Sequence, residues 1–131
     1  MIEFFVQREQ RILMARITGT YDIDEMKRLD DFVRAFVAGQ GEMRGLYDFS
    51  NVEQITVPMT RLAERAGQPS IIGGMRVLVA PRSVGIGMTR MFSEHQSNAG
   101  QTAPMVVGRL EEAYVLLGLH YKAHFEPIEF G

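Results

Sequence analysis

The sequence predicts an α/β fold in one domain, with a single mixed, mostly parallel five-stranded sheet and amphipathic helices in the order ββαβαβαβα. The first observation is that short β-branched and apolar runs alternate with segments whose apolar residues recur every three or four positions. Strands that alternate with helices form largely parallel sheets with right-handed crossovers. The second observation is length, because 131 residues match one domain and bury roughly two-thirds of the unfolded surface.

The composition is that of an ordinary globular protein, with 46% apolar and 23% charged residues. A net charge of −2, with basic residues spread along the chain, does not favour nucleic acid or an anionic membrane as partner. The absence of cysteine excludes disulfides, thiolate catalysis and cysteine-ligated zinc. The chain shows no secretory signal pattern at MIEFFVQREQR and no window near the roughly 20 apolar residues of a membrane helix. We therefore expect a cytoplasmic protein without a membrane partner.

The N-terminal part predicts a hairpin of two strands. Residues 2–7 and 11–18 are rich in β-branched and apolar residues and flank a charged turn. The second strand is apolar on nearly both sides, so we place it inside the sheet. Gly19 is predicted to end it.

A long amphipathic helix follows the hairpin. Asp22 and Glu25 have the spacing of a capping box, and Gly39 and Gly41 are predicted to end the helix. Charged residues, Asp30 among them, occupy the side predicted to face solvent. The apolar stripe at steps of three and four comprises Ile23, Met26, Leu29, Val33, Phe36 and Val37.

The central stretch predicts a strand that runs into a polar loop. Residues 46–49 form a short apolar run typical of an inner strand. Asp48, Ser50 and Asn51 supply short polar side chains that favour a turn. In α/β folds such a loop opens at the carboxyl end of a strand, where ligands and partners bind.

A short helix is predicted between Pro58 and Gly67. Proline favours the first turn of a helix, and glycine favours its end by adopting a positive φ. Its apolar stripe comprises Met59, Leu62, Ala63 and Ala66.

Two further strand–helix units are predicted. Residues 75–80 form a β-branched run typical of a buried strand, and Ser83 is a candidate N-cap for a helix that reaches Gln96. Residues 103–107 are predicted as the last core strand. The final helix, residues 110–119, has as its inward residues Leu110, Ala113, Leu116 and Leu117.

The chain divides into an α/β domain and a tail. We assign residues 1–120 to the domain and residues 121–131 to a C-terminal tail. The apolar residues of the tail alternate loosely, which indicates either an edge strand or a dimer arm.

No pattern in the sequence demands catalysis or a cofactor. Gly85-Ile86-Gly87 follows a predicted strand, but Arg90 stands where a dinucleotide fingerprint needs its third glycine, so we favour close packing. Asp48, Ser50 and His95 have the residue types of a hydrolase triad without its Gly-x-Ser-x-Gly elbow. We therefore expect no catalytic residues and no cofactor.

Two histidines are spaced as metal ligands could be. His120 and His124 are four residues apart, but a metal site needs a third ligand, such as Glu126 or Glu129. We expect the helix to end before these positions and interpret the histidines as solvated, with no metal site.

Methionines occur in several elements that are predicted to face each other across the core: Met59, Met75, Met88, Met91 and Met105. Methionine fills irregular gaps and adapts to apolar ligands. Ordinary packing is the first interpretation. A small apolar pocket lined by Met59, Met88, Met91 and Phe92 is the alternative.

Three segments together resemble a known domain family. They are LYDFSNVEQIT from residue 46, RVLVAPRSVGIGMTRMF from residue 76 and RLEEAYVLLG from residue 109. All three are similar to parts of STAS domains, the anti-sigma-factor antagonists with the SpoIIAA-like fold. The first resembles the family's strand followed by Asp-Leu-Ser-Gly-Val. The second resembles a later strand–helix unit of the family, and the third resembles its closing helix. The resemblance spans most of the chain and implies that fold and a protein partner.

STAS domains often carry a phosphorylatable serine in a short turn before the second helix. Matching Asp48 to the family's strand-end aspartate puts Thr56-Val57-Pro58-Met59 at that turn, where no serine stands. Thr56 is the nearest hydroxyl, and Thr60 follows one turn later. A phosphate on Thr56 would meet the positive end of a helix, but we favour a helix-capping role for this residue.

The hypothesis is a non-enzymatic STAS-like regulatory or protein-interaction domain, whose partner is another protein or a second copy in a homodimer. Its candidate partner- or phosphate-binding residues are Asp48, Ser50, Asn51, Thr56 and Thr60. The alternative is a small apolar-ligand-binding protein with the methionine-lined pocket, by analogy with related SEC14-like domains. An enzyme would need polar groups converging in a cleft, and no spacing in the sequence requires that.

Overall fold

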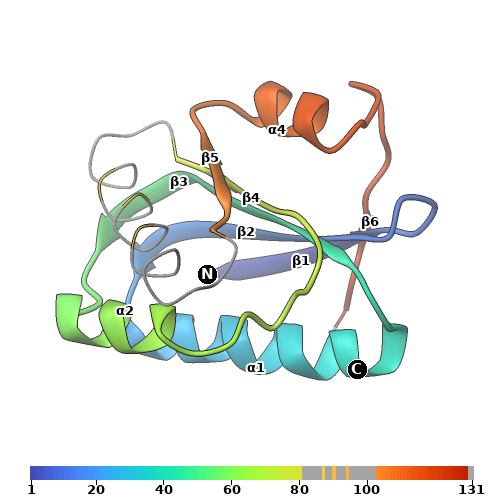
Figure 1. Ribbon diagram of the computed structural model, residues 1–131. Helices are drawn as coiled ribbons and strands as arrows, with labels where there is room; N and C mark the ends of the chain where they lie inside the picture. Colours follow the sequence, from blue (N-terminus) through green and yellow to red (C-terminus); the bar gives the residue numbers. More distant parts are fainter. Residues whose placement is uncertain (81–86, 88–89, 91–93, 95–102, 130–131) are drawn as a thin grey trace.

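The computed structural model describes residues 1–80, 87, 90, 94 and 103–129. Its strands are β1 (Ile2–Gln7), β2 (Ile12–Tyr21), β3 (Arg44–Ile55), β4 (Arg76–Val79), β5 (Met105–Val107) and β6 (Glu126–Pro127). They form one sheet in the order β5-β4-β3-β2-β1-β6 (Figure 1). The three pairs from β2 to β5 are parallel, whereas β1 pairs antiparallel with β2 and β6. The predicted mostly parallel α/β sheet is confirmed, with six strands instead of five.

Helices lie on both sides of this sheet (Figure 1). The helices α1 (Ile23–Gln40) and α2 (Met59–Ala66) lie below it, and α4 (Leu110–Leu116) lies above it. Buried residues accordingly form two clusters, one on the α1–α2 side, which is rich in aromatic rings, and a smaller one on the α4 side. None of the described helices combines the length and the apolar character needed to cross a membrane.

The predicted hairpin is confirmed, but its second strand does not end at Gly19. The strand β2 continues to Tyr21, with Gly19 at a φ of 74° beside an irregularity in the pairing of β2 with β3. Glycine accepts this positive φ without a steric penalty, so here it bends the strand instead of stopping it. As predicted, β2 lies inside the sheet, between β1 and β3.

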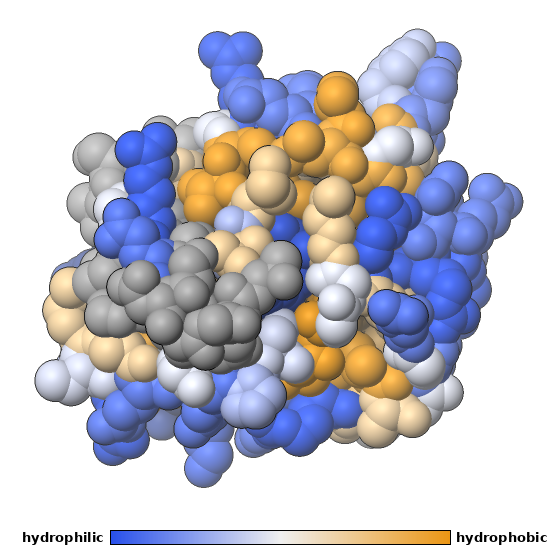
Figure 2. Space-filling model, viewed as in Figure 1, coloured by the Kyte–Doolittle hydropathy of each residue, from blue (hydrophilic) through white to orange (hydrophobic). Residues whose placement is uncertain are grey.

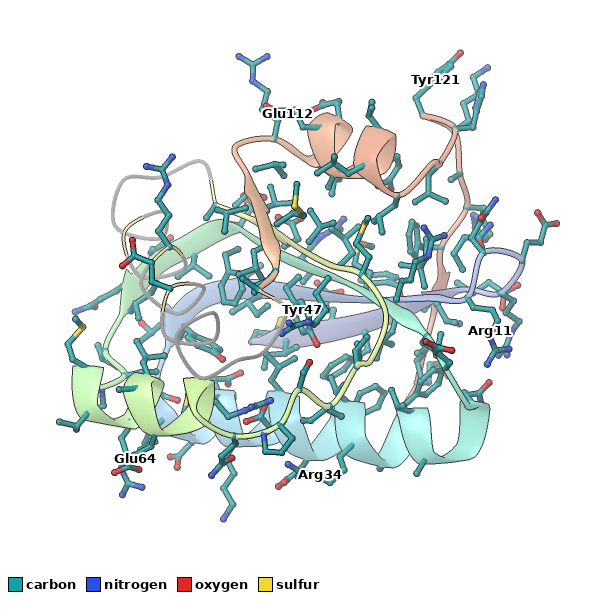
Figure 3. All side chains as sticks on the ribbon, in the orientation of Figure 1. Arg11, Arg34, Tyr47, Glu64, Glu112 and Tyr121 are labelled. Carbon is teal, nitrogen blue, oxygen red and sulfur yellow. The ribbon has the colours of Figure 1, made fainter. Side chains whose placement is uncertain are left out.

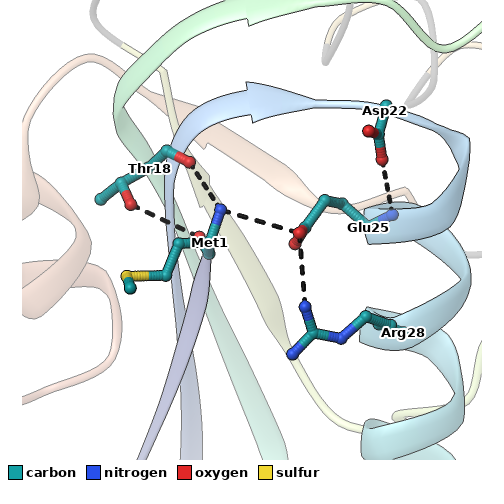
Figure 4. Close-up of polar contacts among 5 residues, drawn as sticks. All are labelled: Met1, Thr18, Asp22, Glu25 and Arg28. Carbon is teal, nitrogen blue, oxygen red and sulfur yellow. Dashed lines mark hydrogen bonds and ion pairs between the residues drawn. The ribbon is translucent and has the colours of Figure 1, made fainter.

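The helix α1 begins as predicted. The Oδ1 atom of Asp22 accepts a hydrogen bond of 2.8 Å from the backbone N–H of Glu25 (Figure 4). The Glu25 carboxylate in turn lies 3.7 Å from the N-terminal amine of Met1 and 3.4 Å from Arg28. The predicted stripe packs inward, with Leu29 and Val33 buried.

The C-terminal end of α1 differs from the prediction. The helix runs through Gly39 to Gln40 and is capped by Gly41, whose φ is 79°. One of the two glycines therefore lies within the last turn, and only the other has the positive φ that glycine tolerates at a helix end.

The predicted polar loop after residue 49 is wrong. Ser50 and Asn51 lie within β3, because the extended β2 supplies hydrogen-bond partners as far as Ile55. Relative to β2, β3 holds one extra residue between Asp48 and Asn51 and another between Val52 and Gln54.

These two extra residues change the spacing of the inward side chains. Phe49, Val52 and Ile55 are three residues apart, and all of them pack into the cluster on the α1–α2 side. The strand therefore lacks the alternation by two that identifies a strand in a sequence.

The helix α2 is confirmed between Pro58 and Gly67, although two of the reasons given for its ends are wrong. Pro58 occupies the N-cap position, and no hydrogen bond from the Thr56 side chain is found among the described residues, so Thr56 does not cap the helix. Gly67 has a φ of −77°, so no positive φ ends α2. Leu62 packs inward as predicted, whereas Met59 is 54% exposed.

The C-terminal half keeps most of the predicted elements. The strand β4 is buried between β3 and β5, as predicted, but β5 lies at the edge of the sheet and not in its centre. In α4, Ala113 and the following Leu117 are buried, as predicted, although the helix ends at Leu116. The strand β6 pairs with β1 of the same chain. The predicted helix from Ser83 to Gln96 lies outside the described residues, apart from three isolated positions.

Candidate functional site

Asp48 is held by partners within the chain. Only 3% of its surface is exposed. Its Oδ1 atom accepts hydrogen bonds from the backbone N–H of Ser50 at 3.0 Å and from the Ser50 hydroxyl at 2.5 Å. Its Oδ2 atom lies 3.4 Å from Nε of Arg16, the residue opposite it on β2. A buried carboxylate needs such partners, so this arrangement braces the middle of β3.

The Arg16 side chain connects this carboxylate to aromatic residues on the α4 side. Its guanidinium lies 5.3 Å from the centre of the Phe5 ring, within the range of a cation–π contact. Burial raises the pKa of the Tyr114 hydroxyl. The charge of Arg16 opposes this rise in pKa, whereas the charge of Asp48 adds to it. The hydroxyl of Ser50 donates directly to the carboxylate, and His95 lies outside the described residues. Asp48 and Ser50 thus contact each other directly, with no histidine between them among the described residues.

Three other predicted site residues lie at the surface. Asn51, near the end of β3, and Thr56 and Thr60, around the start of α2, are exposed. Met59 lies between the two threonines in sequence, and its exposure is unusual for so apolar a side chain. We call these four residues the β3–α2 surface.

Three of the five core-assigned methionines are described by the structure, and all three are exposed. Met59, Met75 and Met105 are 54%, 43% and 48% exposed, so the prediction that they pack into the core is wrong. Met75 comes just before β4, and Met105 begins β5, which ends the order of the described strands. The remaining pocket candidates, Met88, Met91 and Phe92, lie outside the described residues.

A different cavity opens on the α1–α2 side. Its volume is about 100 Å³. The sheet contributes Tyr21, Tyr47, Phe49 and Leu78 to its wall, and the two helices contribute Met26, Leu29, Asp30, Leu62 and Arg65. Figure 3 shows Tyr47 in the layer between the sheet and the helices, whereas Arg34 and Glu64 point away from it. Figure 2 shows hydrophobic residues gathered over α4 and again between the sheet and α1.

Charged groups lie in the wall of this cavity. Nε of Arg65 lies 2.7 Å from Oδ2 of Asp30, and the two side chains are only 13% and 22% exposed. The Nη1 atom of Arg65 is buried and has no hydrogen-bond partner among the described residues. Burial lowers the pKa of Arg76; Tyr47 opposes this shift, and Arg65 adds to it.

The cavity tyrosines are kept in their neutral form. Burial raises the pKa of Tyr47 to about 12, with Arg76 acting in the opposite direction. Burial also raises the pKa of Tyr21, and the charge of Asp30 adds to this shift. Both hydroxyls can therefore donate a hydrogen bond at any physiological pH.

Sequence reasoning missed this cavity, although part of the pattern was available. Asp30 was assigned to the solvent side of its helix, but it lies four residues after Met26 and three before Val33, at the edge of the buried stripe. Arg65 likewise lies three residues after the buried Leu62. Helical spacing thus identifies both as residues beside the core.

The ring of His120 contacts the backbone of the C-terminal tail. The Nδ1 atom of His120 accepts a hydrogen bond of 3.1 Å from the backbone N–H of Lys122. Across the described part of the chain, no group of three His, Cys, Asp or Glu residues is placed to hold a metal ion.

No protein-family model matches the chain, and no curated protein matches it in sequence. Solved structures do match. One is the anti-sigma factor antagonist SpoIIAA in its unphosphorylated form, with a TM-score of 0.59 and 11% identity over 86% of this chain and 94% of that one. Another is an uncharacterized protein of the DUF3478 family from Shewanella loihica PV-4, with a TM-score of 0.56 and 11% identity over 89% of this chain and 92% of that one.

The second protein is itself described as having a SpoIIAA-like fold, so the two matches agree. Both matches cover most of the length of each chain. This chain therefore has the SpoIIAA-like fold, as its resemblance to STAS domains predicted.

Proposed function

We propose that this chain is a non-enzymatic regulatory domain that binds a partner protein through the β3–α2 surface. The fold supports a function of this kind, because the solved SpoIIAA is named for its action against another protein, an anti-sigma factor. The identity of 11% is too low to transfer that particular target. The nature of the contact must therefore be argued from this chain.

The exposed Met59 is the observation that carries the proposal. It is 54% exposed although the same helix buries Leu62. Methionine is enriched at protein interfaces because its flexible side chain fits different apolar surfaces. The exposed hydroxyls of Thr56 and Thr60 flank it and can donate or accept hydrogen bonds at the rim of such a contact.

The same surface offers a means of regulation. Thr56 is exposed and precedes the first turn of α2 by three residues. A phosphate on Thr56 would place a charge of about −2 beside Met59 and change the affinity for a partner. Phosphorylation of Thr56 or Thr60 is therefore part of the proposal.

Affinity capture from the organism's own cell extract tests the proposal. The full chain is compared with Met59→Ser and with a control, Val115→Ser, which removes an even more exposed apolar side chain from α4. We expect the first variant to bind the captured protein at least about tenfold more weakly and the control to bind normally. Both should unfold within about 0.5 kcal/mol of the wild type.

Further variants and a phosphorylation map locate the surface. Alanine at Asn51 or Thr56 should weaken the same partner without a loss of stability. Phosphorylation is mapped on the captured chain in the same sample. Equal recovery of the partner by Met59→Ser and Val115→Ser would rule out this surface.

The mass of the chain in solution decides whether the partner is a second copy. A homodimer and a cytoplasmic location stay predictions from the sequence. The methionine-lined pocket is not a second candidate, because Met59, its one described member, lies at the surface.

A further inference from the structure

The cavity on the α1–α2 side has a wall that is mostly apolar. Two helices and three adjacent strands form this wall, so its shape is fixed by the core of the fold. The rings of Tyr21 and Phe49 meet edge to face in it, at a centroid distance of 5.3 Å. Leu29 and Leu62 line it from the helices. A concave and largely apolar wall with a few polar groups is typical of small-molecule sites.

Two hydroxyls in this wall, those of Tyr21 and Tyr47, have no hydrogen-bond partner among the described residues. In the same part of the chain, the fully enclosed side-chain nitrogen and oxygen atoms without a partner are Oε2 of Glu25 and Nη1 of Arg65. The two hydroxyls are not among these atoms, so each keeps some accessible surface. Because Tyr21 is only 7% exposed and lines the cavity, we place its hydroxyl at the cavity.

The charged residues of the wall do not call for a charged ligand. Asp30 and Arg65 pair with each other at 2.7 Å, and Arg76 has an interaction of its own within the chain. The Nη1 atom of Arg65 is enclosed, so a ligand in the cavity does not reach it. A charge on the ligand would lose its hydration against an apolar wall, which is costly. The wall therefore favours a neutral ligand.

The Tyr21 hydroxyl is a neutral donor. Burial raises its pKa, and the charge of Asp30 adds to this shift, so the hydroxyl keeps its proton at physiological pH. The matching group on a ligand is an acceptor, such as a carbonyl oxygen. A carbonyl is satisfied by a donor alone, whereas an alcohol also brings an O–H that needs an acceptor within the apolar wall.

The volume of the cavity limits the size of a ligand. An apolar cavity of roughly 150 Å³ in another protein admits benzene. The cavity here measures about 100 Å³ and reaches the surface beside the half-buried Ser70 and Ile71. It therefore suits a ligand of about six non-hydrogen atoms or fewer, as a small ring or a short branched chain.

We propose that this cavity binds a compact neutral carbonyl compound, whose oxygen accepts a hydrogen bond from the Tyr21 hydroxyl and whose apolar body packs against Phe49 and Leu62. None of the four residues of the β3–α2 surface lines the cavity. Ligand binding and partner binding can therefore fail independently.

Calorimetric titration of the full chain with cyclopentanone tests the site. We expect a dissociation constant of about 1 mM or tighter and a melting temperature that rises with the ligand concentration. Cyclobutanecarboxylate, a carboxylate of similar size, should bind at least about tenfold more weakly, because its charge would lose its hydration in the apolar cavity.

Two matched tyrosine variants locate the contact. Tyr21→Phe removes the proposed donor and should weaken cyclopentanone about three- to tenfold, the effect of one neutral hydrogen bond. It should change the binding of cyclopentene, a ring of the same size without the oxygen, by less than about twofold. The control Tyr114→Phe removes a hydroxyl on the α4 side and should change neither ligand.

Tyr21→Phe removes no hydrogen bond of the described residues and should melt cooperatively. If it does not, methyl NMR spectra of the wild type with cyclopentanone take its place. The signals of Leu29 and Leu62 should then shift, whereas that of Leu117, buried on the α4 side, should not.

Four results would overturn the site. They are the absence of cyclopentanone binding to the wild type at about 10 mM, equal affinity for cyclopentanone and cyclobutanecarboxylate, equal cyclopentanone affinity in the Tyr21 and Tyr114 variants, and unshifted leucine signals at the cavity. A cavity that holds only water gives the first of these. Loss of the partner protein in the capture experiment would leave these measurements unchanged.

Discussion

The two sides of the sheet bury charge in different ways. On the α4 side, Asp48 has two hydrogen bonds from Ser50 and an ion pair with Arg16. On the α1–α2 side, Arg65 and Asp30 share one contact of 2.7 Å, and Nη1 of Arg65 has no partner in the described part of the chain. A buried charge whose partners are complete acts as structural support. A buried donor that lacks a partner instead keeps the cost of its desolvation.

The two sides of the sheet also differ in how completely their side chains are packed. The α4 side buries aliphatic side chains almost completely, with Leu46, Val77 and Val79 at 0% exposure. The other side contains large rings, such as those of Tyr21, Tyr47 and Phe49, and leaves a cavity of about 100 Å³. The described residues are thus packed more completely on the α4 side than on the α1–α2 side.

The largest expected effect compares a leucine on each side. Leu46→Ala should lower the free energy of unfolding by about 4 kcal/mol, because Leu46 is fully enclosed on the α4 side. Leu78→Ala should cost about 2–3 kcal/mol, because Leu78 already borders empty space. Urea unfolding of both variants measures the difference. Equal losses would mean that the two sides are packed alike.

A second comparison concerns the buried carboxylate. Asp48→Ala should cost about 2–4 kcal/mol, because it leaves Arg16 and the Ser50 hydroxyl without their partner. The control is Asp31→Ala, which removes the exposed partner of Arg34 and should cost less than about 0.5 kcal/mol. A small effect at Asp48, measured by the same urea titration, would show that the cluster is dispensable for stability.

The smallest effect concerns alkaline pH. The pKa of Tyr47 is raised from 10.0 to about 12, so the folded chain holds a proton that the unfolded chain loses above pH 10. Stability is therefore fully present below pH 10 and falls as the pH rises from 10 through 12. In Tyr47→Phe this decline should be shallower, with Tyr21 still contributing to it. Unfolding measured at several pH values between 9 and about 11.5 checks the slope, and identical slopes would contradict the assignment.

The elements that sequence reasoning predicted best have local causes. The start of α1 depends on Asp22 and Glu25, which are close in the chain, and the inward residues of α4 follow its own helical spacing. Both patterns are visible in any isolated stretch of sequence. The same holds for β4, whose short β-branched run needs no knowledge of its neighbours.

The features that were missed depend on contacts between distant residues. The second half of β3 is a strand because β2 continues past Gly19, and no local property of Ser50 or Asn51 indicates that. The place of β5 at the end of the strand order likewise depends on pairing with β4, which its own sequence does not indicate. The cavity joins residues from Tyr21 to Leu78, so its existence depends on how the whole sheet meets its helices.

Because β3 holds two extra residues relative to β2, its length can change at those places without reversing the direction of the side chains beyond them. In a regular strand, such as the part from Arg44 to Asp48, losing one residue would exchange the inward and outward faces of everything beyond it. At the two irregular places, losing one residue would only restore a regular pairing and leave Val52 and Ile55 pointing inward. The distal half of β3 in this chain can therefore lose a residue at these places without reversing its faces, whereas the proximal half cannot.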